Sequence, residues 1–365
     1  MLWLPRILNG QDGSSRSGGP PCSKLSGPPR DFKSYFADTL EIVIMSELRE
    51  AALVAARDCL AVTAGESVLI VTDHLRRPIG DALQAVCQEL AGEVLLLEMA
   101  PRTVNGQEPP AAVAEAMKHV DVVICPTTMS LTHTDARRNA CAAGARVGTM
   151  PSITEDVMIR TMRADYHRIA RRTRIIAEKL TAASVAHITT PAGTDIRIPI
   201  EGISAIASTG LVTKPGTFGN LPSGEAYLMP REGEADGVYV VDGSLAGIGL
   251  ITGEPVRITI EKGLAVAIEG GDQARAFAET VEKVGPKGRV LAELGVGTND
   301  SAAIRGTILE DEKVMGTVHL ALGNNISMGG TCDVAFHVDG LLRRPTLRLD
   351  DEVILDDGKL LVDGD

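Results

Sequence analysis

Residues 289–345 place acids and histidines inside hydrophobic, strand-like runs. The runs RVLAELGVG, GTVHLALG and CDVAFHVDG are separated by glycine-containing turns. The ionisable side chains of the stretch are Glu293, Glu310, Asp311, Glu312, His319, His337 and Asp339. An unpaired charge in a buried strand is very costly, so these side chains need partners. A bound cation would satisfy several of them at once, and we expect the rest of the chain to be a scaffold for this cluster.

Composition restricts the class of protein. The 365 residues are enough for two domains, and the aromatic content of 3% means that the cores must be aliphatic. The net charge of −12 argues against a nucleic-acid partner. No hydrophobic run approaches the ~20 residues that cross a bilayer, so we expect no membrane partner. The six cysteines are scattered without a CxxC pair, which indicates reduced thiols and a cytoplasmic location.

Residues 1–44 differ from the rest of the chain. The segment GQDGSSRSGGPPCSKLSGPP is rich in Gly, Ser and Pro and cannot build a core. The starting run MLWLPRIL is too short for a signal peptide. We therefore expect a disordered leader that is not native, with the natural start at Met45.

Residues 45–185 alternate between strand and helix patterns. Continuous hydrophobic runs at 67–73, 93–99, 120–126 and 146–151 are separated by helical stretches. This alternation is typical of βαβ units and predicts an α/β domain with a parallel sheet. An amphipathic helix over residues 162–183 would close it.

Residues 186–365 predict a β-rich α+β domain that holds the metal-binding and catalytic residues. Short strands with Gly or Pro turns dominate, and the segment EPVRITIEKGLAVAIEG predicts a hairpin through Lys262-Gly263. The one clear helix covers residues 276–285.

His337 and Asp339 have the most informative spacing. Residues two apart on a strand point to the same face, so the imidazole and the carboxylate project together. That pair suits Zn²⁺, Co²⁺, Mn²⁺ or Fe²⁺. The alternative is a surface pair near the turn at Gly340.

The other candidates are less specific when each is taken alone. His319 could be a hydrogen-bonded core residue, although its proximity to the other groups favours a ligand. Glu293 lies between aliphatic residues, which favours a metal ligand or general base. Glu225, after a Pro-Ser-Gly turn, could be a ligand or a turn acid.

The acids at 310–312 lie in a turn, where we expect solvent exposure for at least two of them. Asp73-His74, at the end of the first strand, is expected to be a capping or loop pair. Gly295-Val296-Gly297 lacks the full GxGxxG spacing, which disfavours a dinucleotide site. Neither a GxSxG elbow nor a Cys-His neighbourhood supports nucleophilic hydrolysis.

With these residues identified, the chain from about Met45 to its C-terminus resembles the M29 family of metal-dependent aminopeptidases, of the aminopeptidase T type. The resemblance rests on five motifs in the same order: PSGE (222–225), AELGVGTN (292–299), Asp311-Glu312, GTVHLALG (316–323) and HVD (337–339).

The resemblance implies a dimeric, two-metal exopeptidase with an α/β domain and a C-terminal metal domain. Its ligands fall on Glu225, Glu293, Glu312, His319, His337 and Asp339. The leading prediction is therefore an aminopeptidase that cleaves short peptides or a related amide with two Zn²⁺, Co²⁺ or Mn²⁺ ions. Glu293 would bridge the ions, and Glu225 or Glu293 would accept the proton.

Two alternatives stay open. The aminopeptidases have a tyrosine beyond the ligand histidine, where this chain has Ile326, so a metal-binding protein without activity is one alternative. The other is a branch that resembles 2,5-dihydroxypyridine 5,6-dioxygenase, with one Fe²⁺ on His319, His337 and Asp339 as a facial triad. That branch has a histidine at the place of Glu293 and lacks the PSGE acid. The chain retains both acids, which favours the hydrolase.

Overall fold

The computed structural model describes residues 44–362. Of the predicted leader, residues 1–43 lie outside this range. Residues 44–53 are helical and continue into the π-helix η1 (Val54–Cys59). The predicted division into domains at residues 185 and 186 remains a prediction.

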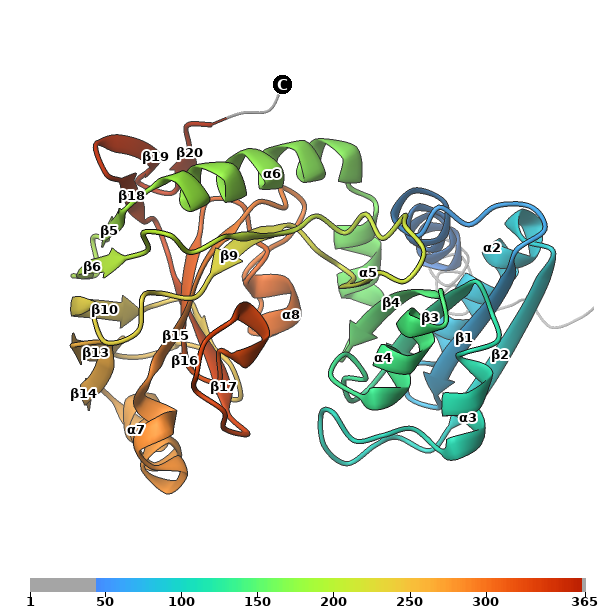
Figure 1. Cartoon of the computed structure of the whole chain (residues 1–365), viewed down its shortest axis with the longest axis horizontal. Coiled ribbons are helices and arrows are strands. Elements are labelled where there is room, and N and C mark those ends of the chain that lie inside the picture. Colours follow the sequence, from blue (N-terminus) through green and yellow to red (C-terminus); the bar gives the residue numbers. More distant parts are fainter. Residues whose placement is uncertain (1–43, 363–365) are drawn as a thin grey trace, which may run out of the picture. The chain divides into compact units, whose positions relative to one another are not determined.

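A five-stranded parallel sheet forms the α/β half (Figure 1). Its order is β2-β1-β3-β4-β8, with β1 (Ser67–Asp73), β2 (Glu93–Met99), β3 (Val122–Thr127), β4 (Arg146–Pro151) and β8 (Phe218–Asn220). The predicted strands at 67–73, 93–99 and 146–151 are confirmed to the residue, and the third begins two residues later than predicted. Strand β8 was not predicted, because three residues are too few for a recognisable pattern.

Both faces of the central strands β1, β3 and β4 are buried. Val68 and Ile70 belong to one hydrophobic core, whereas Leu69 and Val71 belong to another. Alternate residues of one strand point to opposite faces, so a continuous hydrophobic run is what a sheet covered on both sides requires. The helices of this half are α2 (Arg77–Leu90), α3 (Ala111–Ala116), α4 (Asp135–Ala142) and α5 (Glu155–Met162).

The helix predicted at 162–183 is α6 (Tyr166–Ala182). It starts at Asp165, whose carboxylate accepts hydrogen bonds from the backbone N–H groups of His167 and Arg168. Its hydrophobic side, including Ile176 and Leu180, packs in the core of the β-rich half, where α6 contacts β7 (Ile206–Ser208) and β9 (Glu225–Leu228).

The β-rich half contains two antiparallel sheets, which confirms the predicted fold class. The eight-stranded sheet runs β14 (Leu264–Glu269), β13 (Val256–Glu261), β10 (Asp236–Val241), β6 (Asp195–Pro199), β5 (Val185–Thr189), β18 (Thr346–Leu349), β19 (Glu352–Asp356) and β20 (Lys359–Leu360). The seven-stranded sheet runs β12 (Gly249–Leu250), β11 (Ser244–Leu245), β17 (His337–Leu342), β16 (Val318–Gly323), β15 (Leu291–Gly297), β9 and β7. One core contains residues of both sheets, such as Ile196 and Val256 with Leu294 and Leu320.

Local turn and helix predictions also hold in this half. The hairpin between β13 and β14 turns at Lys262 and Gly263, with φ of 49° and 72°. Positive φ at both central residues is the type I′ geometry that matches strand twist. The predicted helix is α7 (Asp272–Val284), and three short helices follow, η2 (Pro286–Arg289), α8 (Ile308–Asp311) and η3 (Ile326–Met328).

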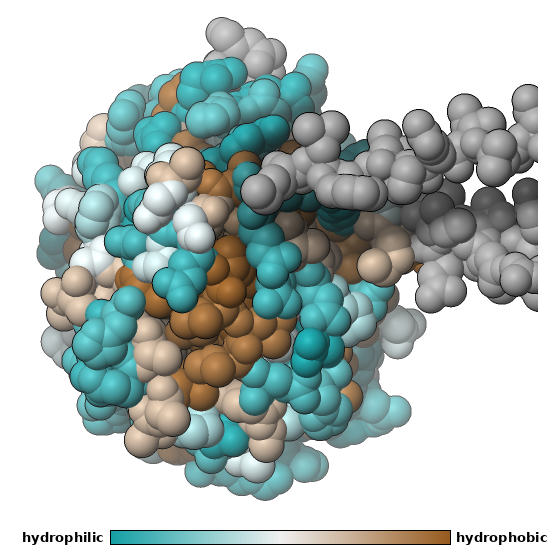
Figure 2. Space-filling view, turned by 90° about the vertical axis from the view of Figure 1, so that its right-hand side faces the viewer, coloured by the Kyte–Doolittle hydropathy of each residue, from teal (hydrophilic) through white to brown (hydrophobic). Residues whose placement is uncertain are grey.

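Strand β2 is the edge of the parallel sheet, and its residue Leu95 exposes 46% of its surface. Figure 2 shows hydrophobic residues gathered on the face of the molecule that includes this side of the α/β half.

Nothing in the structure tests the predicted homodimer, which stays a prediction. None of the described helices is both long and hydrophobic enough to cross a bilayer.

Two smaller predictions concern residues of the α/β half. Asp73 accepts hydrogen bonds from the N–H groups of Leu75 and Thr128, as expected of a loop acid. The described cysteines are all free, in agreement with reduced thiols; Cys22 lies outside the described residues.

Candidate metal centre

The seven-stranded sheet is hydrophobic on one face and carries ionisable side chains on the other. On β15, Leu294 and Val296 enter the core, so Glu293 and Gly295 point to the opposite side. The same alternation holds on β9, β16 and β17. We call the second side the site face, and its residues include Glu225, Tyr227, Glu293, Gly295, Gly297, His319, Ala321, Gly323, His337 and Asp339.

Strand register brings three of these side chains together. Glu293 on β15 lies opposite Ala321 on β16, and Ala321 lies opposite Asp339 on β17. The small side chain of Ala321 leaves space above β16 for the two carboxylates to approach each other. His337 joins them because it lies two residues before Asp339 on the same strand.

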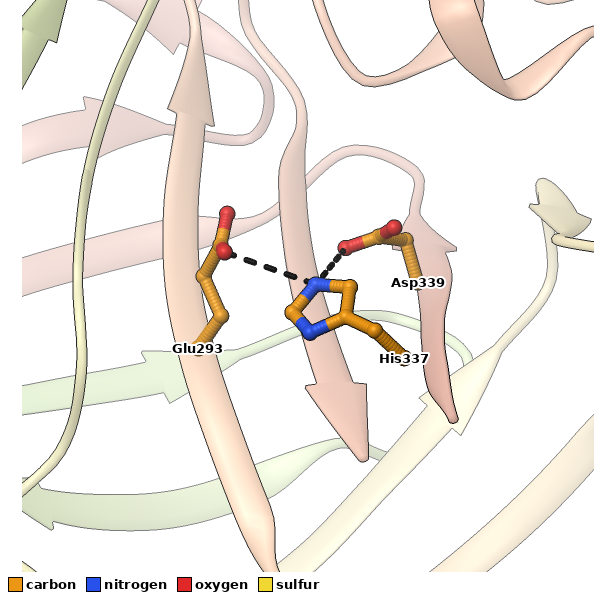
Figure 3. Close-up of side chains that lie close together, drawn as sticks. All are labelled: Glu293, His337 and Asp339. Atoms are coloured by element: carbon orange, nitrogen blue, oxygen red, sulfur yellow. Dashed lines mark ion pairs between the residues drawn. The ribbon is translucent and has the colours of Figure 1, made fainter. Parts of the chain in front are cut away.

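The three side chains point toward one another (Figure 3). His337 Nε2 lies 3.5 Å from Glu293 Oε2 and 3.5 Å from Asp339 Oδ1. One potential ligand atom from each residue lies within 4.8 Å of the others, and this is the one such group found in residues 44–362. Ligand atoms about 2.1 Å from a metal are themselves about 3.0–3.4 Å apart in octahedral or tetrahedral geometry. The three residues are close enough together to be candidate ligands of a single cation.

Hydrogen bonding orients His337, and the neighbouring carboxylates stabilise positive charge beside it. Its Nδ1 lies 2.8 Å from the backbone oxygen of Asn324, so Nδ1–H donates and Nε2 faces the carboxylates. Ligand histidines commonly have such a partner. Burial lowers the pKa of His337, but Asp339 and Glu293 outweigh burial and raise the pKa to about 10. Burial raises the pKa of Asp339, but His337 outweighs it and brings that pKa to about 2. The carboxylates thus hold a positive charge at this point.

His319 lies beside the three residues. It is fully buried, and its Nε2 is 3.2 Å from Glu293 Oε1 and 3.6 Å from Glu225 Oε2. Its Nδ1 makes no hydrogen bond. Gly295 makes room for the ring, because a Cβ there would lie 2.0 Å from His319 Nε2. This explains one glycine of the Gly-Val-Gly sequence without any nucleotide.

The predicted ligands Glu225 and Glu312 pair with a lysine. Lys313 Nζ lies 2.5 Å from Glu225 Oε1 and also donates to Glu312 Oε1. Its side chain is 1% exposed. Burial lowers the pKa of Lys313, but the two acids outweigh burial and raise it above the usual value. The pKa of Glu312 is raised to about 7 by its own burial.

The expectation that at least two acids of the turn at 310–312 are exposed is wrong. Glu310 and Asp311 are fully buried because each has its own partners. Glu310 accepts two hydrogen bonds from Arg160, and Asp311 accepts from the N–H groups of Arg305 and Gly306. Since Glu310 is held by Arg160, Glu312 is the acid of this turn that reaches the other candidate residues.

The tyrosine expected from the aminopeptidases has no counterpart at Ile326, which is in η3 and exposes 47% of its surface. A different tyrosine, Tyr227, lies on the site face two residues after Glu225 and opposite Gly295. Burial raises the pKa of Tyr227, and the charges of Glu225 and Glu293 raise it further.

All six predicted ligands lie on or beside the site face, and three of them, Glu293, His337 and Asp339, offer ligand atoms within 4.8 Å of one another. His319 lies beside this group, and the predicted facial triad of His319, His337 and Asp339 stays a prediction. Sequence reasoning missed Lys313 and Asn324. A lysine directly after Glu312 in a hydrophobic context could have been noticed, whereas a backbone oxygen leaves no trace in sequence.

The fold and this cluster define a metal-binding enzyme with an α/β sheet and a β-rich half that carries the ligands. A family model described as 2,5-dihydroxypyridine 5,6-dioxygenase matches residues 51–362. The chain belongs to this family.

Relatives agree with the assignment. The 2,5-dihydroxypyridine 5,6-dioxygenase of Pseudomonas putida is 24% identical over 256 residues, which cover 67% of this chain and 72% of that protein. The structure of a 2,5-dihydroxypyridine dioxygenase from Pseudomonas putida has a TM-score of 0.74 at 21% identity, over 86% of this chain and 96% of the other. AmpT from Thermus thermophilus has a TM-score of 0.64 at 16% identity, over 87% and 99%. The expected relationship to the aminopeptidases thus holds for the fold, while the family is that of the dioxygenase.

Proposed function

We propose that the chain is an Fe²⁺-dependent dioxygenase that opens a dihydroxylated aromatic or heteroaromatic ring of the 2,5-dihydroxypyridine type. The observation that carries this proposal is the family match over residues 51–362, which includes the whole candidate metal centre. The proposal replaces the aminopeptidase as our leading hypothesis.

The donor set is compatible with ferrous iron. Glu293, His337 and Asp339 offer one imidazole and two carboxylates, and both ligand types suit Fe²⁺ or Mn²⁺. The set differs from a facial triad of two histidines and one carboxylate, since Glu293 takes the place of a histidine. His319, at 3.2 Å from Glu293, orients that carboxylate instead of contributing a ligand atom.

Each residue of the site would have a distinct role in this reaction. Glu293, His337 and Asp339 would hold the ion, which when bound supplies the electron-transfer chemistry that lets O₂ react with a ring. The Asn324 oxygen holds His337 in place. Tyr227 offers a phenol on the same face, where it can contact a ring hydroxyl. In the overall reaction one ring C–C bond breaks and both oxygen atoms of O₂ enter the product, so no external reductant is needed.

A second candidate function is metal-dependent amide hydrolysis. The observation that favours it is the presence of Glu225 and Glu293, two acids on the site face, within a fold that AmpT shares. A carboxylate near a bound ion can accept a proton from water.

The two functions can be separated with one protein sample. Protein loaded with Fe²⁺ without air is mixed with 2,5-dihydroxypyridine in oxygenated buffer, and O₂ uptake and loss of ring absorbance are followed together. We expect both to proceed, with one O₂ consumed per ring. A panel of peptide amides is then offered to protein loaded with Zn²⁺, Co²⁺ or Mn²⁺. Release of amino acids without any ring opening would contradict the dioxygenase.

A matched pair of variants controls for contaminating iron. Asp339→Asn changes the carboxylate that lies 3.5 Å from His337 and should abolish ring opening. Asp195→Asn changes a second histidine–carboxylate pair, in which Asp195 Oδ1 lies 2.8 Å from His187 Nε2 outside the site. This variant should keep the wild-type rate.

A further inference from the structure

Lys313 is a buried cation at the edge of the metal centre. Its side chain is 1% exposed, and its ammonium bonds to one oxygen each of Glu225 and Glu312. A lysine is almost never buried unless its charge is paired. Here the pairing is with two of the acids that the resemblance to two-metal aminopeptidases assigns as ligands.

The carboxylates around the centre fall into two sets. Glu293 and Asp339 face His337, at the spacing of ligands around one ion. Glu225 and Glu312 face Lys313. An ammonium is a compact positive charge with three donors, so it satisfies carboxylate oxygens much as a metal ion would.

The backbone fixes Lys313 in this place. Its N–H donates to the Glu310 oxygen at 2.9 Å, and its own oxygen accepts from the Asn299 N–H at 2.8 Å. Gly297, directly opposite Glu225 in the sheet, allows this close approach. A Cβ on Gly297 would lie 2.9 Å from the Lys313 carbonyl carbon and 2.1 Å from the Val314 oxygen. Gly297, the second glycine of Gly-Val-Gly, thus leaves room for the segment that contains Lys313.

We propose that Lys313 takes the place of a second metal ion, so that the centre binds one divalent cation. Glu225 and Glu312 then act as counter-ions of the lysine and not as metal ligands. The inference rests on the metal centre of the proposed function, but it does not depend on which reaction the centre performs.

Metal stoichiometry tests the inference without an activity assay. Metal-free protein is saturated with Mn²⁺ or Zn²⁺, desalted and analysed for metal per chain. We expect one equivalent in the wild type and two in Lys313→Ala, where Glu225 and Glu312 become available. Lys313→Ala combined with Glu225→Gln should return to one. Lys179→Ala is the matched control, since Lys179 pairs with Glu352 outside the centre, and it should keep one equivalent.

Each contrary outcome has a distinct meaning. Two equivalents in the wild type, or one in a folded Lys313→Ala, would overturn the role of Lys313 alone. No bound metal in the wild type would overturn this inference together with the metal centre. If Lys313→Ala fails to fold, Glu225→Gln and Glu312→Gln provide the test. Both should still bind one equivalent, and a loss of metal in either would show that the acid is a ligand.

Discussion

The Nδ1 atom of His337 lies 2.8 Å from the backbone oxygen of Asn324, at the start of the loop that leads back to β17. The N–H of Asn324 in turn donates to the Phe336 oxygen at 2.7 Å, so the loop closes on the residue before His337. Backbone groups at both ends of this loop therefore fix the position of the His337 imidazole. The stability of this loop should affect how well His337 binds a cation.

Glu232 stabilises the same loop through hydrogen bonds, and we expect Glu232→Gln to make the loop less stable. The Glu232 carboxylate accepts hydrogen bonds from the Thr331 N–H and hydroxyl and from the Asn325 amide, at 2.8 Å each. The Thr331 N–H bond, chiefly, lowers the pKa of Glu232. Its contribution to stability is thus complete above the usual glutamate pKa and is lost as the pH falls through the lowered value.

Thermal unfolding of the metal-free protein at pH 3–7 checks this prediction. Glu232→Gln should lower the stability by about 1 kcal/mol near neutral pH, and its difference from wild type should shrink as the pH falls. Glu261→Gln, at an exposed acid of β13, is the control. A constant difference across the pH range would show that the carboxylate charge is not what holds the loop.

His319 and His337 should differ in their effect on metal binding. We expect His337→Ala to lose the ion, because it removes a ligand atom. His319→Ala should weaken binding about 10–100-fold, as is typical when a residue that orients a ligand is removed. Isothermal titration calorimetry of each metal-free variant with Mn²⁺ separates these two effects on metal binding. Equal loss of binding in both would make His319 a ligand, as the sequence resemblance implied.

Gly295→Ala should disturb the centre although the change adds one methyl group. The new Cβ would lie 2.0 Å from His319 Nε2, so the imidazole must move away from Glu293. Overpacking of this kind costs about 1–3 kcal/mol, which we expect to see in urea unfolding together with weaker metal binding. Gly253→Ala is the control, since a Cβ there meets no atom within 4 Å. Wild-type behaviour of Gly295→Ala would mean that the ring has space that the structure does not show.

Arg160→Met should destabilise the fold strongly, because it leaves the fully buried carboxylate of Glu310 without its cation. Arg160 bonds to both oxygens of Glu310 at 2.8 and 2.7 Å. Breaking such a buried pair costs about 3–5 kcal/mol. Arg344→Met, which breaks an exposed pair with Asp357, should cost far less, because water screens that pair. Chemical unfolding measures both, and similar values for the two variants would contradict this account of Glu310.

The sequence was sufficient for the fold class and for the neighbourhood of the site. Continuous hydrophobic runs located β1, β2 and β4, and the spacing of His337 and Asp339 placed both on one face of a strand. These features are local, so a pattern within a few residues determines them. The pairing of Glu293 with Asp339 is not local, because it depends on how three strands are aligned.

The sequence was insufficient for deciding which acids bind a cation. Glu310, Asp311 and Glu312 look alike in the chain, yet Arg160, two backbone N–H groups and Lys313 give each a different environment. The sequence favoured a hydrolase because the chain retains both Glu225 and Glu293. A sequence motif shows that an acid is present, but it does not show which side chain that acid pairs with. In the structure one of these two acids pairs with Lys313.

Labelling with ¹⁸O₂ tests the proposed reaction most directly. Fe²⁺-loaded protein is given 2,5-dihydroxypyridine under ¹⁸O₂, and the product is analysed by mass spectrometry. We predict that both labelled oxygen atoms enter a ring-opened product, and that His337→Ala forms none. A product whose new oxygen comes from water, or an unchanged ring beside efficient cleavage of a peptide amide, would contradict the assignment.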